Sequence, residues 1–225
     1  MGFKEVKNKN VFLSMILCSV ASFSLLHADN LKECESEEDK KAGCIEKVYD
    51  DNGNLTMERP YKNGVLHGIG KMYYGSGVLE AEMPVKNGKV EGIYKRYYES
   101  GSLSAEKAFK NGKAEGIGKQ YYEDGNLGYE IPFKNDKREG VAKVYYPNGD
   151  IFAEIPYTND KINGMIKCYN EEKKLIWQAN AQNGNLTSGK CSSGKTLTNA
   201  HLTRLASEIS QNITGGAYWF DICKQ

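Results

Sequence analysis

Between residues 47 and 190, short runs of alternating apolar and polar residues are separated by turns that contain glycine. In one copy of this pattern, residues 71–74 favour a strand, and residues 78–85 alternate strictly between apolar and polar. Ser76-Gly77 and Asn87-Gly88 bound the second run, and such pairs are favoured where turn residues need positive φ. The pattern predicts an antiparallel meander of about twelve strands, with a turn about every twelve residues.

The pattern repeats six times with a period of 24 residues and no slippage. The period links lysines, tyrosines and asparagines in all six copies, and glycines and glutamates in five. The aligned residues are Lys47, Lys71, Lys95, Lys119, Lys143 and Lys167; Tyr49, Tyr73, Tyr97, Tyr121, Tyr145 and Tyr169; Asn63, Asn87, Asn111, Asn135, Asn159 and Asn183; Gly53, Gly77, Gly101, Gly125 and Gly149; and Glu58, Glu82, Glu106, Glu130 and Glu154. A fixed period of this length indicates a repeat architecture, and we expect positive φ at Gly101 and Gly125.

The alternation assigns the side chains of each copy to two faces of the predicted sheet. If the Ser-Gly pair forms a two-residue turn, Tyr74 lies opposite Leu79, and Lys71 lies opposite Glu82. Leu79 then belongs to an apolar face, whereas Tyr73, Lys71 and Glu82 share the other face. Repetition would stack that second face into a lysine row, a glutamate row and a tyrosine row.

The N-terminus has the features of an export signal. Lysines precede an apolar run over residues 11–26, and Ala28 is a small residue at the expected cleavage site. We assign residues 1–28 to a signal peptide and residues 29–46 to an N-terminal cap that carries two cysteines. A retained membrane anchor is an alternative, and a lipidated Cys18 is a weaker one. Export implies a periplasmic or secreted protein.

Residues 47–190 form the predicted repeat domain, and residues 191–225 form a C-terminal capping helix and tail. Apolar residues recur at helical spacing from Thr198 to Ile213, with Thr198 as the expected N-cap and Gly215-Gly216 as the stop. In an oxidising compartment, we expect the disulfides Cys34–Cys44 and Cys191–Cys223. Cys168 is then free, and its pairing with Cys191 is the main alternative.

Composition and charge exclude several classes of function. The chain has 30 basic and 29 acidic residues, so its net charge favours neither nucleic acid nor an anionic membrane surface. Contact with membrane lipid remains an alternative that the charge does not support. The cysteines form no C-x-x-C pair, and only His67 and His201 follow the signal segment, so we expect no metal site. We expect no cofactor and no catalytic residue, because no nucleophile motif or phosphate-binding loop is present.

The repeated units resemble the MORN-repeat family, in its variant with Tyr-Tyr, then Gly-x-Leu, then Lys-Asn-Gly-Lys. The third copy carries these motifs as Tyr97-Tyr98, Gly101-Ser102-Leu103 and Lys110-Asn111-Gly112-Lys113. The resemblance covers residues 47–190 and implies an elongated antiparallel sheet of stacked hairpins. Members of this family are linked to protein scaffolding and to phospholipid contact. Bacterial members of this variant are often described as antitoxins.

We therefore expect a mainly β protein: an elongated, twisted antiparallel sheet of six hairpin repeats with a short C-terminal capping helix. The expected function is an exported, non-catalytic scaffold that binds another protein or an envelope component. An antitoxin-like or immunity protein that covers the surface of a toxin is the alternative, and an enzyme ranks third. The candidate binding surface comprises Lys95, Tyr97, Glu106, Lys119, Tyr121, Glu130, Lys143 and Tyr145.

Overall fold

A computed structural model describes residues 31–211, 213 and 217–224. The predicted signal peptide and the Gly215-Gly216 stop lie outside these residues. The helices are α1 (Glu37–Ala42), α2 (Asn199–Gln211) and α3 (Ala217–Asp221). The strands are β1 (Cys44–Tyr49), β2 (Leu55–Lys62), β3 (Val65–Leu66), β4 (Gly68–Tyr73), β5 (Leu79–Lys86), β6 (Lys89–Val90), β7 (Gly92–Tyr97), β8 (Leu103–Lys110), β9 (Lys113–Ala114), β10 (Gly116–Tyr121), β11 (Leu127–Lys134), β12 (Lys137–Arg138), β13 (Gly140–Tyr145), β14 (Ile151–Thr158), β15 (Lys161–Ile162), β16 (Gly164–Tyr169), β17 (Leu175–Gln182) and β18 (Asn185–Cys191).

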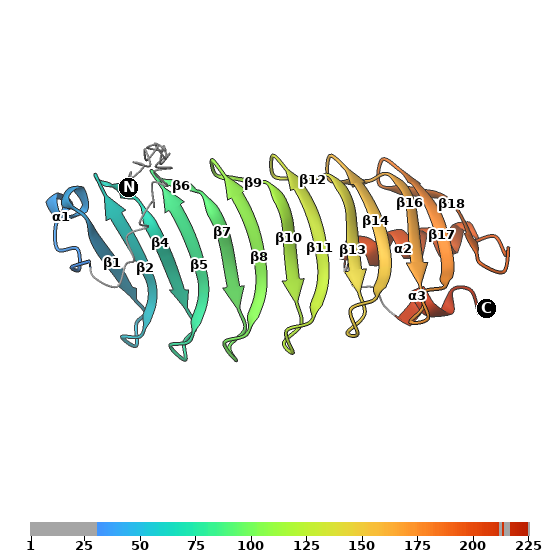
Figure 1. Ribbon diagram of the computed structural model, residues 1–225, viewed down its shortest axis with the longest axis horizontal. Coiled ribbons are helices and arrows are strands. Elements are labelled where there is room, and N and C mark those ends of the chain that lie inside the picture. Colours follow the sequence, from blue (N-terminus) through green and yellow to red (C-terminus); the bar gives the residue numbers. More distant parts are fainter. Residues whose placement is uncertain (1–30, 212, 214–216, 225) are drawn as a thin grey trace, which may run out of the picture.

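The strands form one open antiparallel sheet, in which each long strand pairs with the next long strand along the chain. Figure 1 shows the resulting elongated molecule, with α1 at one end and α2 and α3 at the other. This architecture confirms the predicted mainly β sheet of stacked hairpins with a C-terminal helix. Its physical origin is local, because every strand finds its partner across a short turn.

The sheet has 18 strands rather than about twelve, mainly because five strands are each interrupted and counted as a two-residue piece and a longer piece. β6 has two residues, and Glu91 separates it from β7. The Glu91 N–H still donates to the Pro84 carbonyl at 3.0 Å, so both pieces follow β5. Gly92 has φ of 121° at this interruption, a conformation that glycine adopts without a steric penalty.

The turn at Ser76-Gly77 differs from the prediction. The Tyr74 N–H donates to the Val78 carbonyl, and the Gly77 N–H donates to the Tyr74 carbonyl, so the loop has three residues. Gly77 has φ of 82°, as expected of a type I turn that ends in a glycine bulge. The register shifts between Met72 and Tyr73, which places Leu79 opposite Tyr73. The pairing of Tyr74 with Leu79 was therefore wrong, and the strict alternation ends at this bulge.

The main hydrophobic core lies at the C-terminal end of the sheet. Ile155, Ile166 and Trp177 are fully buried there, together with Leu205 of α2 and Trp219 of α3. Figure 1 shows α2 and α3 behind the last strands, on one face of the sheet only. The apolar stripe of α2 therefore covers this face where the repeats end, as a terminal cap must.

Disulfides close both ends of the sheet. Cys34 pairs with Cys44 at the start of β1, and Cys191 of β18 pairs with Cys223 beyond α3. Both pairings confirm the prediction. Cys168 is free and fully buried, so its alternative pairing with Cys191 is wrong. Two disulfides in one chain indicate an oxidising compartment.

Both terminal segments are held by local hydrogen bonds. At the N-terminal end, the Cys34 N–H donates to the Ile45 carbonyl at 2.9 Å, which occupies part of the outer edge of β1. The Ser36 hydroxyl accepts from the Asp39 N–H and begins α1. At the other end, the Thr198 hydroxyl accepts from the His201 N–H at 3.3 Å, the contact expected of the predicted N-cap.

Candidate functional site

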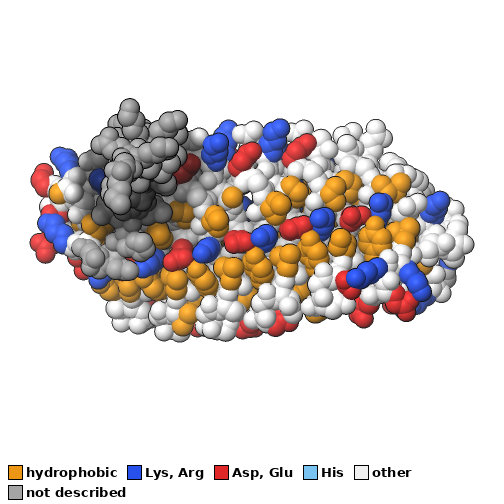
Figure 2. All heavy atoms as spheres, viewed as in Figure 1, with side chains coloured by type: hydrophobic (Ala, Val, Ile, Leu, Met, Phe, Trp, Pro, Cys, Tyr) orange, Lys and Arg blue, Asp and Glu red, His pale blue; other side chains and the backbone are white. Residues whose placement is uncertain are grey.

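Lysines and glutamates alternate across one face of the sheet. Glu82 lies opposite Lys71 on one side and Lys95 on the other, and Glu106 lies between Lys95 and Lys119 in the same way. This pairing confirms the prediction that Lys71 faces Glu82. We call the face that carries these pairs the ladder face. Figure 2 shows it as a row of alternating basic and acidic side chains between bands of hydrophobic ones.

The predicted tyrosine row joins the ladder through hydrogen bonds. The Tyr97 hydroxyl donates to Glu82 at 2.9 Å, and the Tyr121 hydroxyl donates to Glu106 at the same distance. The Lys119 ammonium donates to the same Glu106 oxygen at 3.0 Å. Tyr145 repeats the arrangement, with its hydroxyl 2.8 Å from Glu130. The structure thus brings all eight candidate residues onto one face, while their role in binding stays a prediction.

These contacts determine the protonation of the ladder. The Lys119 ammonium and the Tyr121 hydroxyl lower the pKa of Glu106 against the opposing effect of its burial. Burial and the Glu82 carboxylate raise the pKa of Tyr97 to about 12. At neutral pH Glu106 is therefore charged and Tyr97 is a protonated donor. The groups recur along the sheet instead of converging on one point, an arrangement suited to an extended contact.

A row of exposed apolar side chains runs beside the ladder. Ile93, Ile117 and Val141 are 51%, 50% and 46% exposed, and Met165 continues the row at 38%. Each residue follows a glycine and precedes a ladder lysine by two positions, so alternation places it on the ladder face. The sequence carries a signal for this row in its strict 24-residue period, but the rows predicted from the sequence contain only lysine, glutamate and tyrosine.

The opposite face has a shallow hollow of about 280 Å³ over β7, β8, β10 and β11, in the part of the sheet that precedes the C-terminal core. Tyr94, Arg96 and Tyr129 contribute to its lining. Arg96 forms an ion pair with Glu80 at 2.8 Å, and the Lys107 ammonium lies 4.6 Å from the Phe133 ring centroid. The cations of this hollow are therefore already partnered by a carboxylate and by an aromatic ring.

The histidines take part in local contacts. His67 Nδ1 lies 3.3 Å from the Asn87 amide oxygen, and His201 Nδ1 accepts from the Thr198 N–H. Within residues 31–211, 213 and 217–224, no three metal-ligating side chains come together. Over the same part of the chain, no helix has the length and apolar character needed to span a membrane.

The family model described as "MORN repeat variant" matches residues 45–63, 66–87, 90–111, 114–135 and 138–159. No curated protein matches the chain. Among solved structures, the accessory secretory protein complex from Streptococcus pneumoniae has 16% identity and a TM-score of 0.30 over 44% of this chain. The glycosylation-associated protein complex from Streptococcus agalactiae has 15% identity and a TM-score of 0.31 over 47% of this chain. The chain covers 18% and 19% of those two structures.

Proposed function

The chain belongs to the MORN repeat variant family, and on that premise we propose that it is an exported, non-catalytic scaffold that binds a partner protein through the ladder face. The observation that carries the proposal is the apolar row of Ile93, Ile117 and Val141, each about half exposed beside the charged ladder. Exposed apolar side chains in a contiguous patch are typical of interaction sites.

The two rows make complementary contributions to such an interface. The apolar row supplies area that gains free energy when it leaves water. The ladder lysines remain partly exposed, at 37% for Lys119 and 39% for Lys143, and can meet acidic groups on a partner. Charges of this kind mainly steer association and set specificity, and salt screens them. Affinity would then be distributed over several repeats, with no single dominant residue.

The surroundings of the ladder support recognition over proton transfer. Each of the middle glutamates already accepts from a tyrosine, and Glu106 and Glu130 also pair with a lysine. Rigid, satisfied side chains lose little conformational entropy when a partner binds. The disulfides at both ends support residence in an oxidising, exported location, where the partner would be a protein of the envelope or the exterior.

Site-specific photo-crosslinking tests the proposal. A photoreactive residue at Ile117 would lie on the ladder face. A photoreactive residue at Gln120 would lie on the opposite face, because Gln120 directly follows the ladder residue Lys119 in β10. We expect the Ile117 probe, in the native envelope, to give a discrete crosslinked protein that the Gln120 probe does not give. Equal products from both probes, or none from Ile117, would contradict the proposed surface.

Affinity measurements on the crosslinked partner then distinguish the contribution of the lysine row to binding from that of the apolar row. The triple variant Lys95→Glu, Lys119→Glu, Lys143→Glu should weaken binding at least about ten-fold and in a salt-sensitive way. The variant Ile93→Ser, Ile117→Ser, Val141→Ser should weaken it with the salt dependence unchanged. The turn lysines provide a control with equal charge change: Lys89→Glu, Lys110→Glu, Lys134→Glu. If well-folded ladder variants bind like this control, the ladder is structural.

A further inference from the structure

The alternation of charge on the ladder face breaks at the last repeat. Gln178 of β17 occupies the glutamate position, between Lys167 of β16 and Lys190 of β18. Lys167 keeps the preceding Glu154 at 3.7 Å. Lys190 has no carboxylate within ion-pair distance among the residues that the structure describes, and it is exposed. One negative charge is therefore missing from this end of the ladder.

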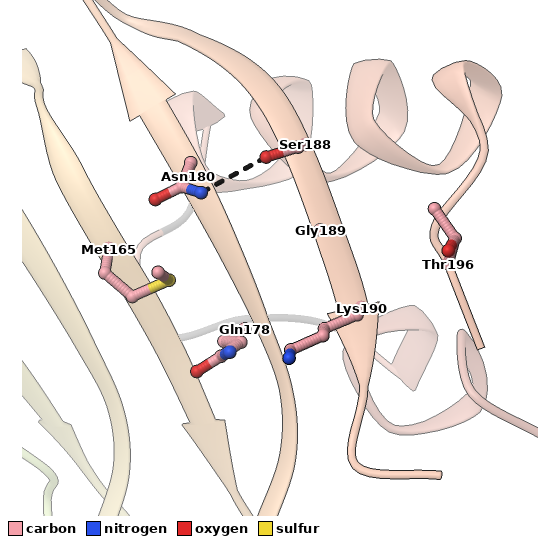
Figure 3. A pocket seen from close by; sticks show the side chains of 7 residues that line it. All are labelled: Met165, Gln178, Asn180, Ser188, Gly189, Lys190 and Thr196. Carbon is pink, nitrogen blue, oxygen red and sulfur yellow. Dashed lines mark hydrogen bonds between the residues drawn. The ribbon is translucent and has the colours of Figure 1, made fainter. Parts of the chain in front are cut away.

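A hollow of about 210 Å³ lies over this position. Figure 3 shows its lining: Gln178 and Lys190 lie side by side, Asn180 and Ser188 face each other, and Met165 and Thr196 flank them. The Asn180 amide donates to the Ser188 hydroxyl at 3.2 Å. The lining has one cation, two amides and two hydroxyls, and it has no acidic side chain.

Two departures from the repeat pattern shape this hollow. Asn180 replaces the proline that Pro132 and Pro156 supply in earlier copies, which adds an exposed amide. Gly189 lets β18 pack closely against the segment before α2, because an added Cβ would lie 2.8 Å from Leu197 Cδ1. The Leu197 N–H also donates to the Gly189 carbonyl at 2.9 Å. The wall that presents Thr196 is therefore held in place by packing and by a backbone hydrogen bond.

We propose that this hollow binds a uronic acid, either free or as a unit of a glycan. The sugar carboxylate would take the place of the missing glutamate and pair with Lys190. Amides and hydroxyls both donate and accept, so Gln178, Asn180 and Thr196 suit the hydroxyl groups of a sugar. Met165 offers an apolar surface to the sugar ring. This inference is independent of the protein-binding role proposed for the middle repeats.

Titration of the disulfide-intact protein with glucuronate tests the inference by calorimetry or by NMR. We expect saturable binding of glucuronate, and of an oligosaccharide that carries it, at least about ten-fold tighter than of glucose or acetate. Glucose lacks the charge and acetate lacks the hydroxyl groups, and each loss removes charge-assisted or neutral hydrogen bonds. Binding of acetate or of an acidic peptide as tight as that of glucuronate would overturn the sugar assignment.

The decisive variant is Gln178→Glu, which restores the residue found in the five earlier copies. It should abolish glucuronate binding, because the new carboxylate would form an ion pair with Lys190. The unfolding midpoint of this variant should stay the same or rise. Lys190→Gln should also lose binding at least about ten-fold. Glu130→Gln is the matched control, since it removes the carboxylate that pairs with Lys143 at a part of the ladder that does not line this hollow. Unchanged binding in Gln178→Glu, or glucuronate binding that Glu130→Gln changes equally, would overturn the site.

Discussion

Single residues set the two kinds of turn in each copy. Asn87 and Gly88 have φ of 51° and 76°, so the turn between β5 and β6 is the two-residue type with positive φ at both positions. At the other end of the hairpin, Gly77 alone has positive φ in a three-residue loop. Gly101 and Gly125 have φ of 86°, which confirms the expectation for these glycines. Asparagine tolerates this region better than other residues with a Cβ, whereas β-branched residues do not.

Gly75 and Gly77 of one loop allow the cost of a positive φ to be measured apart from any steric contact of the side chain. A Cβ on Gly77 or on Gly75 would meet no atom within 4 Å, but only Gly77 has positive φ. Gly77→Val should therefore lower the free energy of unfolding by about 1–3 kcal/mol, and Gly75→Val by less than about 1 kcal/mol. Urea denaturation measures both. Equal losses would mean that the bulge glycine is not needed for its conformation.

At the scale of elements, the repeats depend on a cap that differs from them. Trp219 of α3 is fully buried, with ring centroids 5.6 Å from Trp177 of β17 and 5.4 Å from Phe152 of β14. The Trp177 indole N–H donates to the Trp219 carbonyl at 2.8 Å. A helix of five residues has little stability of its own, so this packing and the Cys191–Cys223 disulfide hold it on the sheet.

Truncation of this aromatic contact should destabilise the cap. Trp219→Ala should lower the free energy of unfolding by about 3–5 kcal/mol, because it leaves a large cavity between α3 and the sheet. Trp219→Phe should cost less than half as much, since it retains an aromatic ring and removes a buried indole N–H that has no hydrogen-bond partner among the described residues. Denaturation with the disulfides intact measures both values. An equal cost for the two variants would argue against cavity formation as the cause.

At the scale of the molecule, the same tyrosine–glutamate hydrogen bond recurs in five successive repeats. The hydroxyls of Tyr73, Tyr97, Tyr121, Tyr145 and Tyr169 each donate to the glutamate 15 positions earlier, at 2.8–2.9 Å. Burial and the neighbouring carboxylate raise the pKa of Tyr97 and of Tyr169 to about 12. These bonds link neighbouring repeats, so their loss should weaken the sheet along much of its length.

Alkaline pH should therefore destabilise the folded sheet. A tyrosine whose pKa is raised by folding contributes its full stability below the unfolded pKa of about 10, and loses it as pH rises to about 12. Tyr97→Phe should cost about 0.5–1.5 kcal/mol at pH 7 and make the decline between pH 10 and 12 shallower. Tyr49→Phe is the control, because Tyr49 is 51% exposed. Denaturant melts across this pH range measure the free energy of unfolding. Identical slopes of that free energy against pH for wild type and Tyr97→Phe would contradict the expectation.

The sequence by itself determined the repeat, the hairpins, the Lys71–Glu82 pairing and both disulfides. These features are local or periodic: each strand pairs across a short turn, and each disulfide joins segments that flank one cap. The rows of candidate residues followed from the same periodicity, because identical hairpins stack in register. Residues that recur every 24 positions along the chain therefore form a row across the sheet.

Three other features were decided only by the tertiary structure: the bulge in each hairpin, the docking of the C-terminal helices and the hollow beside Gln178. The bulge at Met72 and Tyr73 depends on the hydrogen bonds of the three-residue loop, and it moved Leu79 opposite Tyr73. The docking of α2 and α3 covers one face and one end of the sheet, which the spacing of apolar residues in a helix does not specify. The hollow beside Gln178 arises because β18 and the segment before α2 meet there. Such contacts join parts of the chain that no repeat relates, and their geometry comes from packing.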